Sequence, residues 1–251
     1  MGVGIPPAAA YDRAITIFAP DGRIYQVEYA FESVRRGWTT IGIKSKHGAV
    51  VVVHKKKISP LVDEKLVQKI FIIDDHIGAS YAGLAGDGRV LIEYARQLAL
   101  LHRFYYDEPI PVELLAKQIC DVKQAYTQHA GVRPFGVSII FAGVDVDNTT
   151  QLFTTDPNGR YLSYYAVSIG EKSNEAISYI EKHYSYEKSL TDIIKLGIET
   201  IVNVVTEEEV TSENIEAGYI SVDEKKFKIM TSRDISEYYN ELVREGRIKR
   251  K

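Results

Sequence analysis

Residues 11–30, YDRAITIFAPDGRIYQVEYA, mark where the fold of this chain begins. The Pro20-Asp21-Gly22 run predicts a turn, because proline presets its backbone angle and glycine accepts the left-handed conformation. Apolar residues then recur at helical spacing and predict a short amphipathic helix. They are Ile24, Val27, Phe31 and Val34. Such a short helix is marginal in water unless its apolar side docks, and the run GWTTIG at 37–42 opens the first core strand. We therefore expect an N-terminal arm that precedes the core and is held by something outside it.

Downstream of the arm, strand-like and helix-like stretches come in groups. Short runs rich in β-branched residues predict strands, and apolar residues spaced three and four apart predict helices. The expected strands lie at 39–45, 49–54, 70–74, 76–83, 137–144, 151–155, 160–168, 217–222 and 227–230. The expected helices lie at 87–105, 112–126, 173–183, 189–206 and 232–244.

This order of elements indicates the fold class. Strands in hairpin groups, with helix pairs between them, disfavour a doubly wound parallel sheet, in which strands and helices alternate one by one. Two antiparallel sheets face to face, each covered by a helix pair, would bury every apolar stripe. We therefore predict an α+β fold, a four-layer αββα sandwich preceded by an extension helix. Residues 1–37 would form the arm and extension helix, and 38–251 a single sandwich domain.

Composition excludes several classes of protein. With 251 residues and 45% hydrophobic content, the chain can bury one large core without disulfides or metals. A formal charge of -3 disfavours a nucleic-acid binder, and the single Cys120 suits a reducing compartment. No apolar run is long enough to span a membrane, and residues 1–10 do not resemble a secretory signal. We expect a cytoplasmic protein with no nucleic-acid or membrane partner.

Other motifs are weak indicators of chemistry. Gly83-x-x-Gly86-x-Gly88 could cradle a phosphate, but a strand-to-helix turn with Asp87 as the N-cap explains it more simply. The six histidines show no pairing typical of a metal site, so we expect no metal and no cofactor. Cys120 lies on the apolar side of a helix and is most simply a core residue. The Lys/Arg-rich segment 246–251 is most simply a solvated end.

The arm carries a family resemblance. Residues 11–30 closely resemble the N-terminal signature of proteasome α subunits in an archaeal-like form, and the likeness extends to about Arg244. It continues through Gln68-Lys69-Ile70, Ile73-Asp74-Asp75, Gly83-Leu84, Tyr126-Thr127-Gln128 and 131–136, GVRPFG. The resemblance implies the sandwich fold of N-terminal-nucleophile hydrolases. It also implies a subunit that builds the outer ring of a core proteasome and gates entry to the proteolytic chamber.

The family's catalytic β subunits use an N-terminal threonine as nucleophile, with its own α-amine as base and a lysine and an acid nearby. Alignment on Gly42 places Trp38 at the nucleophile position, His54 at the acid and Lys69 at the lysine. An indole cannot attack a carbonyl, so we expect no catalytic residue and no enzyme activity of this chain alone. The alternative is a β-like precursor that cleaves itself before Thr39 to become a threonine peptidase. A third hypothesis is a solitary binding module that holds a phosphorylated ligand at the 83–88 turn.

The arm residues Tyr11, Asp12 and Arg13 can exchange hydrogen bonds between two arrangements of a loop. Composition alone favours an ordered tail of no special function. By resemblance, Tyr11, Asp12, Pro20 and Tyr29 match a cluster that holds the gate open, and Arg13 belongs to the same arm. Proline fixes the backbone at the turn, so an activator that displaces Pro20 would swing the arm.

Lys69 has two interpretations. By itself it is most simply an exposed lysine at a strand edge. By resemblance, Lys69 lies in a pocket between neighbouring α subunits and pairs with the C-terminal carboxylate of an ATPase activator tail. The resemblance also implies that Gly83 and Leu84 line this pocket and that Glu28 lies near the pivot of the arm. The partners implied are a homo-heptameric α ring, catalytic β subunits, ATPase activators and unfolded protein substrates.

Overall fold

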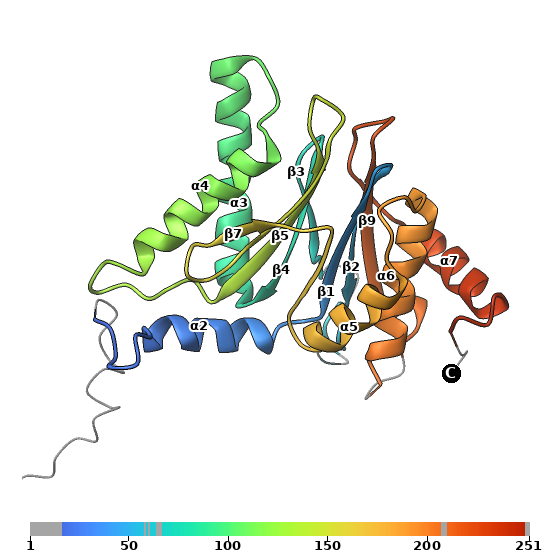
Figure 1. Cartoon of the computed structure of the whole chain (residues 1–251), viewed down its shortest axis with the longest axis horizontal. Helices are drawn as coiled ribbons and strands as arrows, with labels where there is room; N and C mark the ends of the chain where they lie inside the picture. Colours follow the sequence, from blue (N-terminus) through green and yellow to red (C-terminus); the bar gives the residue numbers. More distant parts are fainter. Residues whose placement is uncertain (1–16, 58, 60, 64–66, 207–209, 249–251) are drawn as a thin grey trace, which may run out of the picture.

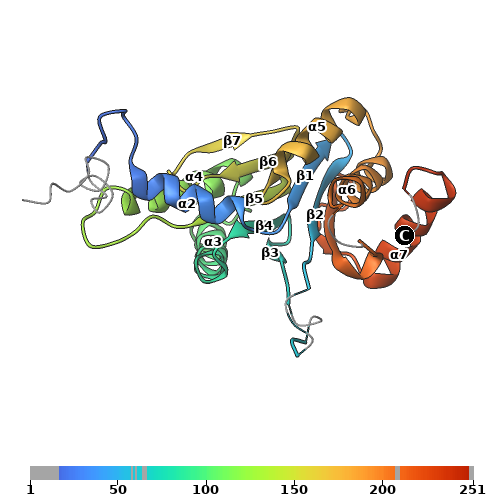
Figure 2. The same cartoon turned by 90° about the horizontal axis from the view of Figure 1, so that it is seen from below.

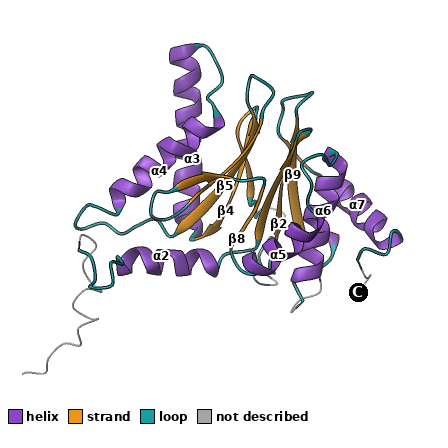
Figure 3. Cartoon of the chain, viewed as in Figure 1, coloured by secondary structure: helices purple, strands orange, loops and turns teal. Residues whose placement is uncertain are grey.

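The computed structural model describes residues 17–57, 59, 61–63, 67–206 and 210–248. Two five-stranded antiparallel sheets pack face to face and are covered outside by helices, so the predicted four-layer α+β sandwich is confirmed (Figures 1 and 3). One sheet has the order β10-β9-β2-β1-β8 and the other the order β3-β4-β5-β6-β7. The strands are β1 (Thr40–Ser45), β2 (Gly48–His54), β3 (Ile70–Asp74), β4 (Ile77–Gly83), β5 (Val137–Val144), β6 (Thr150–Thr155), β7 (Tyr161–Ser163), β8 (Ala166–Ile169), β9 (Ile215–Ser221) and β10 (Lys228–Ile229).

Helices cover the two outer faces unequally. In Figure 1, α3 and α4 cover the sheet that contains β4 and β5, and α5, α6 and α7 cover the sheet that contains β1 and β2. Besides a 3-10 turn at Ser212–Asn214, the described ranges hold six helices. They are α2 (Tyr25–Arg35), α3 (Ala85–Tyr106), α4 (Val112–Tyr126), α5 (Ser173–His183), α6 (Leu190–Val204) and α7 (Ser232–Arg244).

The helix α2 packs on its own chain. Its Val27, Ala30 and Val34 are buried, and it lies across the ends of β4 and β5 (Figure 2). Val34 joins the apolar cluster between the two sheets. The expectation that only something outside the core holds this helix is therefore wrong, because the open end of the sandwich supplies an apolar surface that the helix alone lacks. The preceding turn is confirmed: the Gly22 N–H donates to the Ala19 carbonyl at 2.8 Å, with Gly22 at a φ of 79°.

One predicted strand, 160–168, is two strands in different sheets. β7 pairs with β6, whereas β8 pairs with β1. The change falls between two tyrosines: the Tyr164 N–H donates to the Leu152 carbonyl in β6, and the Tyr165 carbonyl accepts from the Lys44 N–H in β1. Local sequence favours extended backbone throughout this stretch, so only the pairing partners reveal the crossing.

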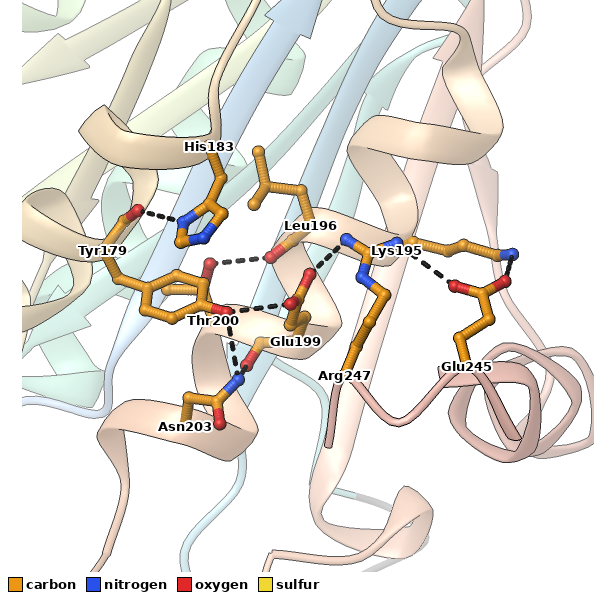
Figure 4. A network of polar contacts seen from close by, with 9 residues as sticks. All are labelled: Tyr179, His183, Lys195, Leu196, Glu199, Thr200, Asn203, Glu245 and Arg247. Atoms are coloured by element: carbon orange, nitrogen blue, oxygen red, sulfur yellow. Dashed lines mark hydrogen bonds and ion pairs between the residues drawn. The ribbon is translucent and has the colours of Figure 1, made fainter. Parts of the chain in front are cut away.

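The C-terminal segment folds back onto α6, which corrects the expectation of a solvated end for its described part. Ile248 is buried in the core beneath the helices. The Arg247 guanidinium pairs with the carboxylate of Glu199, which also accepts a hydrogen bond from the Tyr179 hydroxyl at 2.8 Å (Figure 4). Burial and the Glu199 carboxylate raise the pKa of Tyr179 to about 12. The Lys195 ammonium binds the Glu245 carboxylate beside this network at 2.6 Å.

Candidate functional site

The candidate site lies where the segment after α2 meets the end of β4. Gly83 ends β4 with a φ of +119°, and a side chain there would meet the Gly136 carbonyl oxygen at 2.1 Å. Gly37 lies over it, since a Cβ on Gly37 would meet the Gly83 nitrogen at 2.4 Å. Only glycine fits such close backbone approaches. These contacts place the segment between α2 and β1 directly against Gly83, next to the half-exposed Leu84 in the chain.

Lys69 is buried beside that contact. It immediately precedes β3, on which Ile70 pairs with Ser80 of β4. Its ammonium lies 4.0 Å from the centroid of the Tyr81 ring and 4.9 Å from that of Trp38, in an aromatic cage. With only 7% of the residue exposed, burial lowers the pKa of Lys69 to about 8, against the opposing charge of Glu216. The simpler interpretation, an exposed lysine at a strand edge, is therefore wrong.

Glu216 fixes the backbone of this lysine from the opposite sheet. Its carboxylate oxygens accept the Lys69 N–H at 3.1 and 3.3 Å and the Ile70 N–H at 2.9 Å. The Lys55 ammonium lies 3.6 Å from the same carboxylate. Glu216, on β9, thus accepts hydrogen bonds from two N–H groups at the start of β3 and holds the Lys69 backbone in position.

A cavity of about 790 Å³ adjoins the cage. Trp38, Gln68 and Glu216 form part of its wall, and the run Lys55 to Lys57 brings three lysines to it. Lys69 does not line the cavity, although Trp38 and Gln68 do. The indole of Trp38, which lines the cavity and lies 4.9 Å from the Lys69 ammonium, therefore stands between the two.

The threonines considered as nucleophiles are engaged in the core. Thr39 is 1% exposed, and its hydroxyl donates to the Glu171 carbonyl. The Thr40 hydroxyl donates to the Trp38 carbonyl at 3.2 Å. His54, at the position of the acid, is buried, and its backbone N–H donates to the Thr39 carbonyl at 2.9 Å. The backbone at 37–40 is hydrogen-bonded on both sides, because the Gly37 carbonyl accepts the Glu171 N–H and the Thr39 carbonyl accepts the His54 N–H.

The arm residues lie away from the lysine. Glu28 is in the first turn of α2, nine positions before Gly37, which corresponds to about 13 Å along a helix. Tyr29 is half-exposed, and Pro20 lies exposed in the turn beyond. Tyr11, Asp12 and Arg13 lie outside the described residues. The structure thus brings Lys69 close to the end of β4, where Gly83 and Leu84 follow Tyr81 in the chain, and places Glu28 and Pro20 further along the arm.

Asp87 does not cap its helix. α3 begins at Ala85, with Leu84 as a cap that has no side-chain hydrogen bond. The Asp87 carboxylate instead binds the Arg133 guanidinium through two hydrogen bonds of 2.6 and 2.8 Å and accepts the Gly136 N–H at 2.9 Å. Burial raises its pKa, but these bonds outweigh burial, so the pKa of Asp87 is lowered. A carboxylate at this helix N-terminus disfavours the phosphate cradle considered for 83–88.

Sequence reasoning missed Tyr81 and Glu216 as neighbours of Lys69. Tyr81 could have been found, because it stands opposite Lys69 in the predicted hairpin. The sequence around Glu216 did not indicate its role, beyond the fact that it is an acidic residue next to apolar strand residues. No group of three or more metal-binding side chains occurs within the described ranges. None of the described helices is both long and apolar enough to cross a bilayer.

Comparison with known proteins agrees with these features. A family model described as "Proteasome subunit" matches residues 34–220, and a second model, for the N-terminal signature of A-type proteasome subunits, matches 11–32. The chain is 50% identical to the proteasome α subunit of Sulfurisphaera tokodaii, over 90% of this chain and 94% of that protein. It is 48% identical to the protein of the same name from Saccharolobus islandicus, over 94% and 98% of the two chains. The same identity holds for the Sulfolobus acidocaldarius protein, over 92% and 96%.

Proposed function

Because this chain belongs to the proteasome subunit family and carries its α-type N-terminal signature, we propose that it gates the core proteasome from an outer, non-catalytic ring. In this role it admits unfolded polypeptide, excludes folded proteins and receives ATP-dependent activators. The observation that carries the proposal is Trp38: an indole follows the α-type arm at the position where a peptidase subunit needs its threonine.

The absence of catalysis by the chain alone is supported by the bonds around Trp38. A threonine nucleophile needs a free α-amine and an accessible hydroxyl. The Thr39 hydroxyl is bound to Glu171, and the Lys69 ammonium faces two aromatic rings. Intact mass of the purified protein tests this part of the proposal. A chain that starts at Met1 or Gly2 agrees with it, whereas a chain that starts at Thr39 and hydrolyses peptides unaided would refute it.

The ring partners are supported by exposed apolar surface. At the base of the arm, Ile17 is 43% and Phe18 is 70% exposed. At the end of α3, Phe104, Tyr105 and Tyr106 are each at least 67% exposed. Apolar patches of this kind are typical of subunit contacts. We infer a homo-heptameric ring stacked on catalytic β subunits in the cytoplasm, where the buried thiol of Cys120 would stay reduced.

Gating is assigned to the arm, with Tyr11, Asp12, Arg13, Pro20 and Tyr29 as its residues and Glu28 at its pivot. Pro20 and Gly22 form a defined turn between the arm and α2, so a push on Pro20 would be passed to the whole arm. The test compares peptide hydrolysis by the co-assembled α/β particle with full-length chain and with a deletion through Asp12. We expect faster hydrolysis after deletion. Rates that the deletion leaves unchanged, both for small peptides and for unfolded protein, would contradict gating.

Activator docking is assigned to Lys69, with Gly83 and Leu84 beside it. A lysine ammonium is a suitable partner for the single carboxylate at the end of an activator tail. Its burial among Trp38, Tyr81 and Glu216 means that this charge is held in one place. Replacement by methionine, which keeps most of the length of the side chain and removes its charge, should abolish stimulation by the ATPase and leave basal peptide hydrolysis unchanged.

A further inference from the structure

We propose that Trp38 is a movable cover over Lys69, so that an activator's terminal carboxylate reaches the ammonium only after the indole has moved aside. This inference rests on the proposed docking function of Lys69 and adds a step that controls it. In this proposal, Trp38 sets the affinity of the α ring for activator tails.

The ammonium is covered and lacks an anion. It lies between the Trp38 and Tyr81 rings, at 4.9 and 4.0 Å from their centroids, in a residue that is 7% exposed. Within the described part of the chain, no carboxylate oxygen lies within 4.0 Å of it, and the Glu216 carboxylate serves backbone N–H groups and Lys55 instead. A buried cation without a close anion favours the arrival of one.

Trp38, which packs at the edge of the apolar cluster between the sheets, is held less firmly than Tyr81. Tyr81 is 5% exposed, is stacked on Phe71 at 5.8 Å, and abuts Gly88 so closely that a Cβ there would lie 2.7 Å from its ring. Trp38 is only partly buried and lines the cavity of about 790 Å³. Its indole therefore has open space on one side and the ammonium on the other.

The backbone of Trp38 stays in place when the indole moves. The Gly37 carbonyl accepts the Glu171 N–H at 2.8 Å, and the Trp38 carbonyl accepts the Thr40 hydroxyl at 3.2 Å. Gly170 packs so closely that a Cβ there would lie 2.3 Å from the Trp38 carbonyl oxygen. Opening is therefore a side-chain rotation, which requires no rearrangement of β1.

The cavity next to the cover suits a peptide terminus once Lys69 is exposed. Among the described residues that line it, the three lysines at 55–57 stand with Asp63, Glu213 and Glu216, so these formal charges balance. Lys69 would add a further positive charge at the wall behind Trp38. That charge selects a carboxylate over an amide at the end of the bound chain.

The cover lowers apparent affinity, because the tail binds only the fraction of molecules in which the indole has moved. Removing it by Trp38→Ala should tighten binding of a tail peptide by about fivefold, which corresponds to an open fraction of roughly one fifth. Trp38→Phe keeps an aromatic face over the ammonium and should give a smaller gain. Because a variant that binds the peptide more tightly must be folded, tighter binding by Trp38→Ala cannot be an artefact of misfolding.

Trp38 is the only tryptophan of the chain, so its fluorescence reports the cover directly. The probe is a tryptophan-free octapeptide with the C-terminal sequence of a proteasomal ATPase, added to the assembled full-length chain. The control is the same peptide with an amidated end. We expect the free acid to shift the emission to the red and to increase quenching by acrylamide, and the amide to do neither.

The outcomes separate the two proposals. Binding that needs both the free carboxylate and Lys69, with the fluorescence change and tighter binding in Trp38→Ala, supports both. Binding that is lost in Lys69→Met but leaves the Trp38 emission unchanged, or that Trp38→Ala weakens, overturns the cover and leaves the docking function intact. Binding that is indifferent to Lys69→Met or to amidation, or no binding at all, overturns the docking function and the cover with it.

Discussion

The carboxylate of Glu216, in β9 of one sheet, accepts the backbone N–H of Ile70, in β3 of the other, at 2.9 Å. This bond and those to Lys69 join the two layers of the sandwich at the entrance to the lysine cage. A polar tie inside a largely apolar interface helps to fix how the sheets sit relative to each other. It also fixes where the Lys69 side chain starts.

Replacing Glu216 by alanine should destabilise the fold by about 2–4 kcal/mol, because two buried N–H groups lose their acceptor. Replacing it by glutamine keeps an acceptor oxygen and should cost less than half as much. Urea denaturation of the two variants measures the difference. Equal losses would show that charge, and not hydrogen bonding, is what Glu216 supplies.

Deprotonation of Lys69 should be visible in the emission of Trp38. Burial lowers the pKa of Lys69 to about 8, so the indole faces an ammonium below that pH and a neutral amine above it. We expect a fluorescence transition with a midpoint near pH 8 that disappears in Lys69→Met. A transition that persists in that variant would assign it to another group.

The same pKa predicts how Lys69 affects stability. The folded value of about 8 lies below the ordinary lysine value of 10.5, so between these pH values the unfolded chain binds more protons at this site. The contribution of Lys69 to the free energy of unfolding therefore rises with pH across that window and is least favourable below pH 8. The measurement is the free energy of unfolding as a function of pH. Between pH 8 and 10.5 it should rise more steeply with pH in the wild-type chain than in Lys69→Met.

Gly83→Ala should disrupt the contact between Gly37 and β4. Gly83 has a φ of +119°, and a Cβ there would meet the Gly136 oxygen at 2.1 Å, so we expect a loss of 3 kcal/mol or more, on the order of the larger single-residue effects. The matched control is Gly86→Ala, because a Cβ at Gly86, within α3, meets nothing within 4 Å. That change should be neutral or stabilise by about 1 kcal/mol. Similar losses in both variants would contradict the steric explanation.

Arg247→Ala should leave the carboxylate of Glu199 buried without its guanidinium (Figure 4). Breaking one side of a buried pair costs about 3–5 kcal/mol, and because Arg247 is partly exposed we expect about 2–3 kcal/mol by thermal unfolding. The control, Arg233→Ala, breaks the exposed Arg233–Glu237 pair and should cost less than about 0.5 kcal/mol. Rescue of Arg247→Ala by Glu199→Gln would confirm that the unpaired charge is the cause.

Local pattern determined the order and type of the elements. The bounds expected for α5, α7 and β5 agree with the structure residue for residue. These segments have an unbroken period and sharp ends, such as the Thr231 cap of α7, so their signals lie within a few residues. The family could be recognised from the arm for the same reason, since its signature is contiguous.

The candidate site was only partly predictable from sequence. The match to the family singled out Lys69, Gly83 and Leu84, and the structure places Lys69 close to the end of β4, where the other two follow Tyr81 in the chain. Pattern alone could not give the burial of Lys69, which depends on Trp38 folding over it from a segment that precedes β1. Nor could it assign Asp87 to Arg133, because a side chain at a helix start caps its own helix unless a distant cation competes.

The sequence by itself therefore determined the elements, the sandwich class and the family, because hydrophobic period, turn chemistry and a contiguous signature are all read over short distances. The tertiary structure alone decided that the chain crosses between sheets at Tyr164 and Tyr165, that α2 docks on its own strands, and that Glu216 supports Lys69 from the opposite layer. Each of these depends on which distant segments compete for the same hydrogen bonds and apolar surface. That competition is settled only when the two sheets pack.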